Sequence, residues 1–333
     1  MLVLSQQDVT ALLPMDACIE VMASTLTALA RGETILPLRT VIRFPDGSGA
    51  FAVMPGYLGA PTTIGAKVIT VLPGNHGTAF DSHQGAVLLF DAVNGSLAAL
   101  LDATAITTIR TAAVSAVATR LLARHDASAL AIIGAGVQAH AHLEAMCAVR
   151  QITTLRVWSR NAEHARELAR VGRERFHLDA SAAATGAEAV READIVCTAT
   201  SANEPVLFGD WLSAGTHVNA VGTSQPHARE LDSAAVVRSR LYVDRRESAL
   251  NEPGDILAPL RAGEIGADHI VGEIGEVLAG VAPARGNDEE ITLFKSLGLA
   301  IEDLAAASYV YEAARRTGAG TRVELGGARH AAN

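Results

Sequence analysis

The chain has 333 residues, of which 49% are hydrophobic and 19% charged, and its formal net charge is −9. The length predicts two domains, and an acidic chain without a basic stretch argues against a nucleic-acid partner. The sequence has no apolar run of about 18 residues and no signal-peptide pattern, so we expect no membrane partner. Cys18, Cys147 and Cys197 lack metal-ligand spacing, which favours buried free thiols in a cytoplasmic protein with no metal site.

The first part of the chain is predicted to be an α+β domain. Ser5 and Asp8 fit a capping box before a first helix, and a second helix is expected from Met15 to Ala30. The two strand-like segments AVLLFD and LAALLD flank Asn94-Gly95, which is a strong hairpin signal. We therefore expect an antiparallel sheet with a helix beside it, built from PLRTVIRF, GAFAVMP, GAKVITVLP, QGAVLLFD and LAALLD.

An Ala-rich helix is predicted from Ile106 to Arg124, and strands and helices alternate after it. This alternation is typical of a Rossmann-type, doubly wound parallel sheet. A last helix, about Ala300 to Arg315, has an apolar face that we expect to pack on the first domain, and the tail from Thr317 is expected to fray. The predicted domains are thus 1–124 with 299–333, and 125–298. The expected parallel strands are ALAIIG, TLRVWS, DIVCTA, HVNAVG, RLYVD and ITLFKS, with NAEHARELARVGRERF, GAEAVREA and DSAAVVRS as helices between them.

The segment GAGVQA follows the first of these strands directly and predicts a dinucleotide site. The G-x-G-x-x-A pattern lets a pyrophosphate approach the start of a helix, expected near Gln138, although a plain strand-to-helix turn is the alternative. The next strand ends in Ser159-Arg160-Asn161, where an Asp or Glu would select NAD(H). A guanidinium there favours NADP(H) over NAD(H), unless Arg160 merely covers the adenine. The residues expected to hold the cofactor in this domain are Gly134, Gly136, Val137, Gln138, Ser159, Arg160, Asn161, Thr198, Val221, Gly222 and Ser296.

Three cations lie in otherwise apolar segments: Arg39 in PLRT, Lys67 in GAKVIT and Arg110 in TTIRTAA. Lys67 and Lys295 are the only lysines of the chain. Internal salt bridges are one reading of the three cations. Few carboxylates lie near them in the sequence, however, which favours a ligand carboxylate or phosphate as their partner. His83 opens a strand and fits either a donor to a ligand or a structural role.

The motifs RTAAVSA, GAGVQA, NAVGTSQPHARELD, YVD, GDI and FKSLGLAIEDLAAA together resemble the ornithine cyclodeaminase/mu-crystallin family, and its mu-crystallin branch most. The resemblance runs from Arg39 to about Tyr311. It implies a substrate domain that forms a homodimer through its antiparallel sheet, a Rossmann domain, and a final helix that returns to the first domain. It also implies that Arg39, Lys67 and Arg110, with Met54, surround a substrate carboxylate. Further cofactor contacts are implied for Ser82, His83, Gln84 and Thr111, across a cleft.

Two departures from the cyclodeaminases bear on the reaction. Those enzymes carry a carboxylate before the Met-Pro motif, where this chain has Ala52, and an aspartate where it has Ser224. Deaminative cyclisation moves several protons and needs such acid/base groups, so we expect only its last half-reaction to remain, which is hydride delivery to a C=N bond. We therefore predict an NAD(P)H-dependent reductase of ketimine or imino acids, acting on Δ1-pyrroline-2-carboxylate or Δ1-piperideine-2-carboxylate and forming L-proline or L-pipecolate.

The expected roles follow from that reaction. Arg39 and Lys67 anchor the substrate carboxylate, Arg110 completes that pocket, and Ser224 hydrogen-bonds the imine nitrogen or a water. A proton relay through Lys67, His83 or water stays open. The alternatives are an acyclic imine reductase that resembles alanine dehydrogenase, ornithine cyclodeaminase itself, and an NADPH-dependent protein that binds a small ligand as mu-crystallin does.

Overall fold

The computed structural model describes residues 1–75 and 77–326. It divides into two compact units, one of Met1–Arg110 with the chain from Leu299 onward, the other of Thr111–Gly298. The first boundary falls inside helix α3 (Ala103–Leu122) and not after Arg124 as expected. The second half of α3 is bonded to the second unit, because Ser115 Oγ lies 2.9 Å from His142 Nε2 and Thr119 Oγ1 accepts a 2.9 Å hydrogen bond from Asn219 Nδ2.

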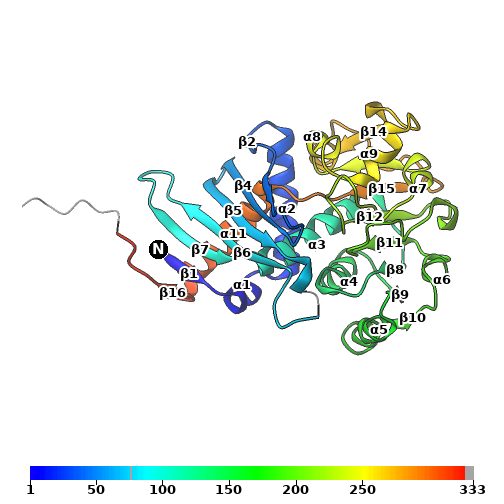
Figure 1. Cartoon of the computed structure of the whole chain (residues 1–333), viewed down its shortest axis with the longest axis horizontal. Helices are drawn as coiled ribbons and strands as arrows, with labels where there is room; N and C mark the ends of the chain where they lie inside the picture. Colours follow the sequence, from blue (N-terminus) through cyan, green and yellow to red (C-terminus); the bar gives the residue numbers. More distant parts are fainter. Residues whose placement is uncertain (76, 327–333) are drawn as a thin grey trace, which may run out of the picture. The chain divides into compact units, whose positions relative to one another are not determined.

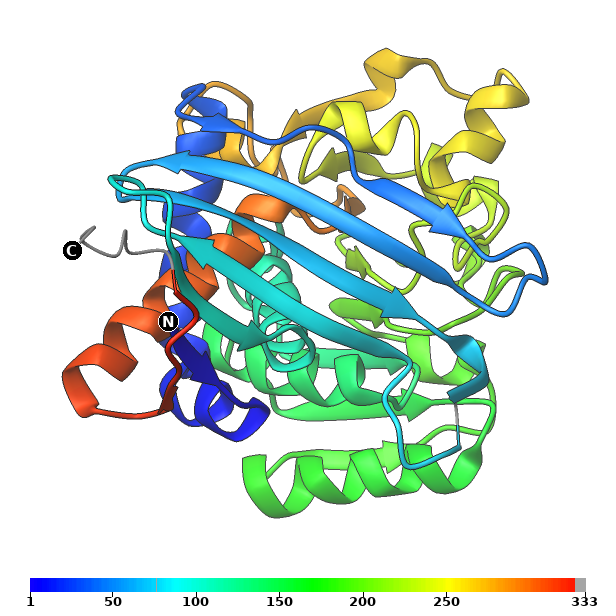
Figure 2. The same ribbon diagram turned by 60° about the vertical axis from the view of Figure 1, so that its left-hand side comes forward.

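The first unit is a twisted sheet with helices on one face (Figure 2). Its strand order is β16-β1-β7-β6-β5-β4-β2, and β3 also pairs with β4. The pairs from β4 to β7 are antiparallel, as predicted, whereas β1 runs parallel to β7. The strands are β1 (Leu2–Leu4), β2 (Thr34–Ile35), β3 (Thr40–Arg43), β4 (Ala50–Gly59), β5 (Thr62–Val71), β6 (His83–Phe90), β7 (Leu97–Asp102) and β16 (Thr321–Arg322). The helices are α1 (Gln6–Leu12), α2 (Met15–Ala30), α11 (Ala300–Thr317) and the short 3-10 helix η1 (Pro73–Asn75).

Local sequence explains these elements well. The capping box of α1 is present, since Ser5 N donates to Asp8 Oδ2 at 2.9 Å and Asp8 N donates to Ser5 Oγ at 3.2 Å. The predicted hairpin joins β6 to β7, and Gly95 adopts the φ of +75° that its turn requires. The tail was expected to fray from Thr317, but β16 pairs with β1, while the remainder of that tail from residue 327 lies outside the described residues.

The predicted last helix, α11, packs on α2, β4 and β5 of the first unit. Gly65 in β5 permits this approach, because an added Cβ would collide with the Leu88 carbonyl and lie 2.7 Å from the side chain of Leu304. Side chains alternate along β5, so that Gly65, Lys67 and Ile69 share the buried face. Lys67 therefore lies on the helix-covered face of the sheet.

The second unit is an eight-stranded parallel sheet with helices, as predicted (Figure 1). Its order is β10-β9-β8-β11-β12-β15-β13-β14, so the direction of winding reverses between β8 and β11. The edge strands β10 and β14 were not predicted, because each has four residues and no marked hydrophobic run. The strands are β8 (Ala129–Ile133), β9 (Thr154–Trp158), β10 (Asp179–Ala182), β11 (Ile195–Thr198), β12 (His217–Ala220), β13 (Arg240–Val243), β14 (Ile270–Glu273) and β15 (Thr292–Lys295).

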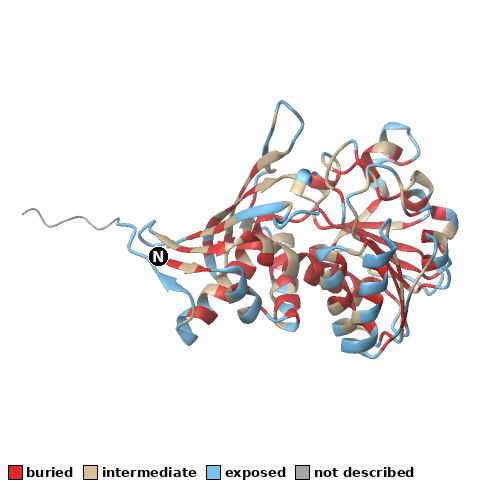
Figure 3. Ribbon diagram, turned by 60° about the horizontal axis from the view of Figure 1, so that its bottom comes forward, coloured by how far each residue is buried: buried red, intermediate tan, exposed pale blue. Residues whose placement is uncertain are grey.

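The helices of this unit follow the strands in sequence. Helix α6 was predicted to run to Ala193 but ends at Val190, shortly before Glu192 turns to a φ of +61°. The helices are α4 (Val137–Val149), α5 (Ala162–Phe176), α6 (Gly186–Val190), α7 (Ser233–Val237), α8 (Arg246–Ala249), α9 (Gly254–Arg261), α10 (Ile274–Leu278), and the 3-10 turns η2 (Gly209–Trp211) and η3 (Ala267–His269). The strands form the buried centre of the unit, and exposed residues gather on the outer helices (Figure 3).

The cysteines are free, as expected: Cys18 and Cys197 are buried and Cys147 is half-buried. Burial raises the pKa of the Cys18 and Cys197 thiols to about 12 each, which disfavours thiolate chemistry. Among the described residues no single helix is long and apolar enough to cross a membrane, and α1 and α2 meet that test only as a pair bent by 84°.

Candidate functional site

The turn between β8 and α4 is the segment where the sequence predicts a dinucleotide site. Gly134 has a φ of +114°, and a side chain there would collide with the Ala199 carbonyl. Gly136 caps α4, and a Cβ added to it would meet no heavy atom within 4 Å. Within the described chain no side chain caps this helix, so open space lies over its amino end, where backbone N–H groups and the helix dipole favour an anion. These features fit the pyrophosphate of a dinucleotide.

The end of β9 lies beside this turn, because Gly134 N donates a 2.8 Å hydrogen bond to the Trp158 carbonyl. Arg160 follows and is exposed, and Ser159 is half-buried. Asn161 caps α5 through a 2.9 Å bond from Glu163 N to its Oδ1, so one of its two polar groups already has a structural role. The segment thus presents a guanidinium and a hydroxyl where the adenosine ribose is expected.

The residues at the carboxyl ends of the other strands were predicted to hold the cofactor, and the structure fits this prediction only in part. Thr198 is fully buried and its hydroxyl donates at 2.9 Å to Glu230, so this side chain does not line an open site as expected. The side chain of Thr198 points inward, to the carboxylate of Glu230, which lies 32 residues away in the sequence. Val221 is half-buried and Gly222 exposed after β12, and Ser296 is buried after β15.

Sequence reasoning missed Glu230 and its partners. Glu230 and Asp255 are buried carboxylates near the carboxyl ends of these strands, and Lys295 Nζ lies 3.0 Å from Asp255 Oδ2. The rarity of lysine and the motifs HARELD and GDI were the available signals. The sequence did not reveal that these charges meet.

The first unit brings the predicted cations together, but their partners differ from the expectation. Lys67 Nζ lies 2.7 Å from Asp303 Oδ2. Arg110 donates from Nε to Asp303 Oδ1 and from Nη1 to Glu302 Oε2, both at 2.8 Å. Lys67 and Arg110 therefore form internal salt bridges, which was the alternative reading, and the expectation that they lack protein partners was wrong. Both carboxylates come from α11, about 200 residues away in the sequence, so local composition could not reveal them.

Burial controls the chemistry of Lys67, whose side chain is 3% exposed. Burial lowers its pKa to about 8, with Asp303 opposing and Arg110 and Arg39 adding to the decrease. A 3.3 Å hydrogen bond joins Lys67 Nζ to Thr107 Oγ1. An ammonium with a pKa near 8 is suited to donate a proton at neutral pH.

The remaining predicted residues of the first unit lie as follows. Arg39 is half-buried in the segment between β2 and β3 and not in a strand, since Pro37 lacks the amide hydrogen that strand pairing uses. Met54 is buried opposite Lys67 in the β4–β5 pairing. Ser82 Oγ lies 3.1 Å from His83 Nδ1 at the exposed start of β6.

Two other expected cofactor ligands have contacts or burial of their own. Gln84 Nε2 donates to the Asp81 carbonyl at 3.1 Å, and Thr111 is buried in α3. In the second unit, Ser224 is half-buried in the loop after β12.

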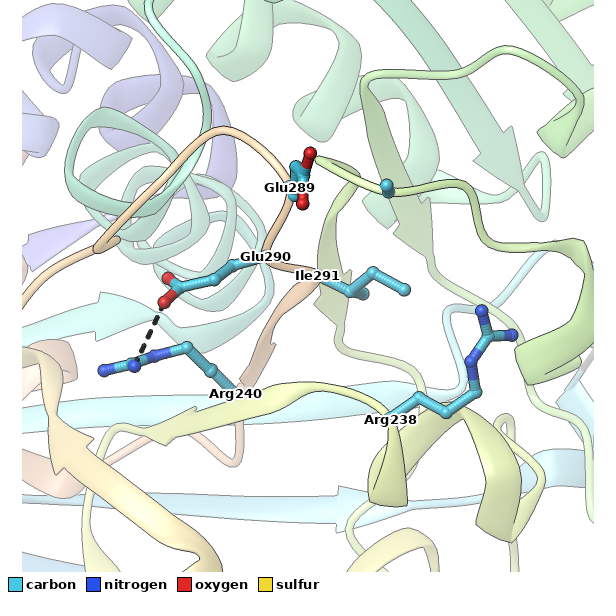
Figure 4. A pocket seen from close by; sticks show the side chains of 6 residues that line it. Arg238, Arg240, Glu289, Glu290 and Ile291 are labelled. Atoms are coloured by element: carbon cyan, nitrogen blue, oxygen red, sulfur yellow. Dashed lines mark hydrogen bonds and ion pairs between the residues drawn. The ribbon is translucent and has the colours of Figure 1, made fainter.

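A separate open pocket, with a volume of about 360 Å³, lies at the amino ends of the parallel strands (Figure 4). It is lined by Ala214, by Arg238 and Arg240 at or just before the start of β13, and by Glu289, Glu290 and Ile291 before β15. Arg240 already pairs with Glu290 at 3.1 Å. Ligands of open α/β sheets bind at the carboxyl ends of the strands, so this pocket is not part of the candidate site.

Comparison with known proteins places the chain in a family. A model of the "Ornithine cyclodeaminase/mu-crystallin family" matches residues 1–318, so the chain belongs to that family, which confirms the resemblance found in the sequence. It is 44% identical to the ketimine reductase mu-crystallin of Mus musculus over 281 residues, which are 84% of this chain and 86% of the relative.

Two solved structures are similar over nearly the whole chain. The Δ1-pyrroline-2-carboxylate reductase of Thermococcus litoralis, in complex with NADH and L-proline, has a TM-score of 0.95 and 41% identity, and the match covers 97% of this chain and 100% of that one. An archaeal alanine dehydrogenase dimer with bound NAD has a TM-score of 0.92 and 31% identity, covering 98% and 99%. The predicted fold class is thereby confirmed.

Proposed function

We propose that this protein is an NAD(P)H-dependent ketimine reductase that reduces Δ1-pyrroline-2-carboxylate or Δ1-piperideine-2-carboxylate to L-proline or L-pipecolate. The observation that carries the proposal is the similarity over nearly the whole chain to a Δ1-pyrroline-2-carboxylate reductase in complex with NADH and L-proline. The buried ion-pair cluster of the first unit agrees with it, because Lys67 in that cluster has a pKa lowered to about 8. The similarity to a ketimine reductase and to a pyrroline-2-carboxylate reductase with L-proline supports the same substrate class.

The bound cofactor would supply a hydride to the imine carbon. Arg39 and Lys67 anchor the substrate carboxylate. The ion pair of Lys67 with Asp303 holds the ammonium in a fixed position for that task. Arg110 completes the pocket and keeps Asp303 in place through its 2.8 Å bond. Lys67, with its pKa near 8, is the group we assign to supply the proton that keeps the imine nitrogen protonated.

The departures at Ala52 and Ser224 separate this reaction from cyclodeamination. Ala52 is 6% exposed and shares the buried face of β4 with Met54, so no carboxylate is available there for proton transfer. Ser224 offers a hydroxyl, which hydrogen-bonds but is not a base at neutral pH. These positions support a single reduction step in place of an oxidation, ammonia loss and re-reduction.

The preference for NADP(H) over NAD(H) is part of the proposal. Arg160 is exposed at the end of β9, beside the glycine turn, where a guanidinium suits a 2′-phosphate. The relatives of known structure named above hold NADH or NAD, so the assignment depends on Arg160 and its neighbour Ser159.

We further propose that the protein is a homodimer. The face of the first sheet turned away from α11 carries Tyr57, Ile64 and Phe90 opposite one another on β4, β5 and β6, and Ile64 and Phe90 are more than a third exposed. Ile42, on the neighbouring strand, is 59% exposed. A continuous apolar face of this kind favours burial against another chain, and the similar alanine dehydrogenase is a dimer.

A substrate panel tests the function. Cofactor oxidation is followed at one enzyme concentration with Δ1-pyrroline-2-carboxylate, Δ1-piperideine-2-carboxylate, and pyruvate with ammonia, each with NADPH and with NADH. We expect the cyclic imines to have the highest kcat/KM. A higher value for pyruvate with ammonia would favour an alanine dehydrogenase, and tight NADPH binding without any turnover would favour a ligand-binding protein.

A further inference from the structure

Three buried charged residues lie together at the carboxyl edge of the parallel sheet and have no place in the substrate chemistry above. Glu230 is fully buried, and Asp255 and Lys295 are each 1% exposed. All three belong to the second unit. Burying such charges is costly unless each one is hydrogen-bonded or paired, so their contacts indicate what the cluster holds in place.

The carboxylate of Glu230 joins the ends of two neighbouring strands. Its Oε2 accepts from Thr198 Oγ1 at 2.9 Å, at the end of β11, and from Gly222 N at 2.6 Å, just after β12. Its Oε1 accepts from Thr200 N at 2.7 Å and from Thr200 Oγ1 at 2.8 Å. An ionised carboxylate can accept four hydrogen bonds in this way, whereas an amide oxygen and amine cannot.

Glycine at position 222 is required by this contact. A Cβ there would collide with the Thr200 carbonyl and with the Glu230 carboxylate. Thr200 in turn accepts from Ala202 N at 3.2 Å, which shapes the loop that continues from β11. The Glu230 carboxylate therefore determines the path of both strand-end segments, 198–200 and 221–222.

The remaining two charges hold Glu230 itself. Asp255 Oδ1 accepts from the backbone N of Glu230 at 2.7 Å and from that of Leu231 at 3.0 Å. The other oxygen of Asp255 pairs with Lys295 at the end of β15. Three strand ends, those of β11, β12 and β15, are thus connected through one buried network, although burial raises the pKa of Glu230.

A carboxylate at the opposite edge provides a comparison within the same sheet. Asp194 accepts from the backbone N of Ser128 and of Ala129, both at 2.9 Å, and pairs with Arg124. Asp194 connects the amino ends of β8 and β11. Cofactors of this fold bind at the carboxyl ends of the strands, so we expect Asp194 to contribute to stability alone. Glu230 joins strand ends at the edge over which the nicotinamide half of a dinucleotide lies in this fold.

We infer that Glu230 is a positioning residue, whose carboxylate fixes segments 198–200 and 221–222 in the arrangement that binds the nicotinamide half of the cofactor. Asp255 and Lys295 keep that carboxylate in place. The inference rests on the proposed use of NAD(P)H but not on which imine is reduced. It predicts that loss of the carboxylate weakens the grip on the nicotinamide end and spares the adenosine end.

The test compares Glu230→Gln with the matched control Asp194→Asn. Binding of NADPH and of 2′-phospho-ADP-ribose, which lacks nicotinamide, is measured by calorimetry for each protein. In Glu230→Gln the amide NH₂ faces the N–H of Thr200 or of Gly222, so one segment must move. We expect NADPH affinity to fall about tenfold or more, and the affinity for the fragment to stay within about twofold. Asp194→Asn should leave both affinities unchanged while lowering the melting temperature.

Equal losses for NADPH and the fragment, or no loss for either, would overturn the inference. If Glu230→Gln does not fold, Thr200→Val serves instead, because it removes one donor to Glu230. It should weaken NADPH about threefold and leave the fragment unaffected, and unchanged NADPH binding would again overturn the inference. No imine is present in these binding experiments, so their result does not depend on which imine is reduced. A failure to reduce imines, measured separately, would count against the proposed function and would leave this result unaffected.

Discussion

The two lysines of this chain are both buried in ion pairs, yet their surroundings differ in charge and in what they connect. Lys67 lies 2.7 Å from Asp303 in a cluster that also contains Arg110 and Glu302. Arg39 lies near enough to lower the pKa of Lys67, so cations outnumber carboxylates there. Lys295 lies 3.0 Å from Asp255, and Glu230 makes that cluster richer in carboxylates. The first cluster joins side chains of strand β5 and of helices α3 and α11, and the second holds backbone amides at and near the strand ends.

This difference separates two tasks. A cation-containing cluster suits the binding of an anionic substrate and the supply of a proton, because a buried lysine with a pKa near 8 changes protonation close to neutral pH. A carboxylate that accepts backbone N–H groups suits the fixing of loops. Variants of the two clusters should therefore fail in different measurements.

The largest effect is expected for Lys67→Met. Loss of the ammonium removes both a carboxylate anchor and the proposed proton donor, so kcat/KM should fall by about 10²–10⁴-fold. The NADPH dissociation constant should not change. Thr107→Val is the matched control, since it removes the 3.3 Å hydrogen bond to Lys67 and leaves the ammonium of Lys67 in place. A cooperatively folded Lys67→Met that retains activity would show that Lys67 has only a structural role.

Lys295→Met should instead act on stability. It leaves Asp255 as an uncompensated charge within the protein, which costs about 3–5 kcal/mol in the free energy of unfolding. Urea denaturation measures this loss. With saturating NADPH the KM for the imine should stay close to that of the wild type, and a large increase in this KM would show that the two clusters do not have separate tasks.

Asp303→Asn sharpens the account of Lys67. Asp303 raises the pKa of Lys67 against the effect of burial, so its removal should lower that pKa further. For the wild type, kcat/KM should decrease as pH rises through about 8, where Lys67 loses its proton. In the variant this decrease should move to lower pH by about 1–3 pH units. An identical pH profile for both proteins would exclude Lys67 as the proton donor.

Arg160→Asp probes the cofactor end of the second unit. An aspartate repels a 2′-phosphate and can bind a ribose hydroxyl, so the ratio of kcat/KM for NADPH to that for NADH should fall about tenfold to hundredfold. Arg166→Ala is a suitable control. Arg166 is also an exposed arginine, on the helix that follows, but it pairs with Glu163. An unchanged ratio in Arg160→Asp would refute the assignment of the 2′-phosphate.

The smallest effect is expected for Ser224→Ala. The loss of one neutral hydrogen bond to the imine nitrogen or a water should lower kcat about two- to tenfold and leave NADPH binding intact. A loss comparable to that of Lys67→Met would instead assign Ser224 a direct part in proton transfer.

Local patterns predicted much of the fold and part of the site. The capping box at Ser5, the limits of α2 and the hairpin at Gly95 depend on near neighbours in the chain, and the structure confirms all three. The glycine turn was recognisable for the same reason, since a strand, two glycines and a helix follow one another. Strands of four residues at the sheet edges gave too little pattern to be recognised.

The charge partners could not be predicted from the sequence. Asp303 is 236 residues from Lys67, and only the packing of α11 on β5 brings the two together. Likewise, Thr198 was expected to line an open site, and the structure buries it against Glu230. Such pairings depend on how distant segments of the chain pack together, which the sequence near a residue does not reveal.

The most direct test of the central claim is the stoichiometry of one reaction. Purified protein is incubated with Δ1-pyrroline-2-carboxylate and NADPH, and the cofactor oxidised and L-proline formed are both quantified. We expect one L-proline for each NADPH consumed, and no proline or ammonia from ornithine with NAD. Tight NADPH binding without proline formation, or the release of ammonia from ornithine, would contradict it.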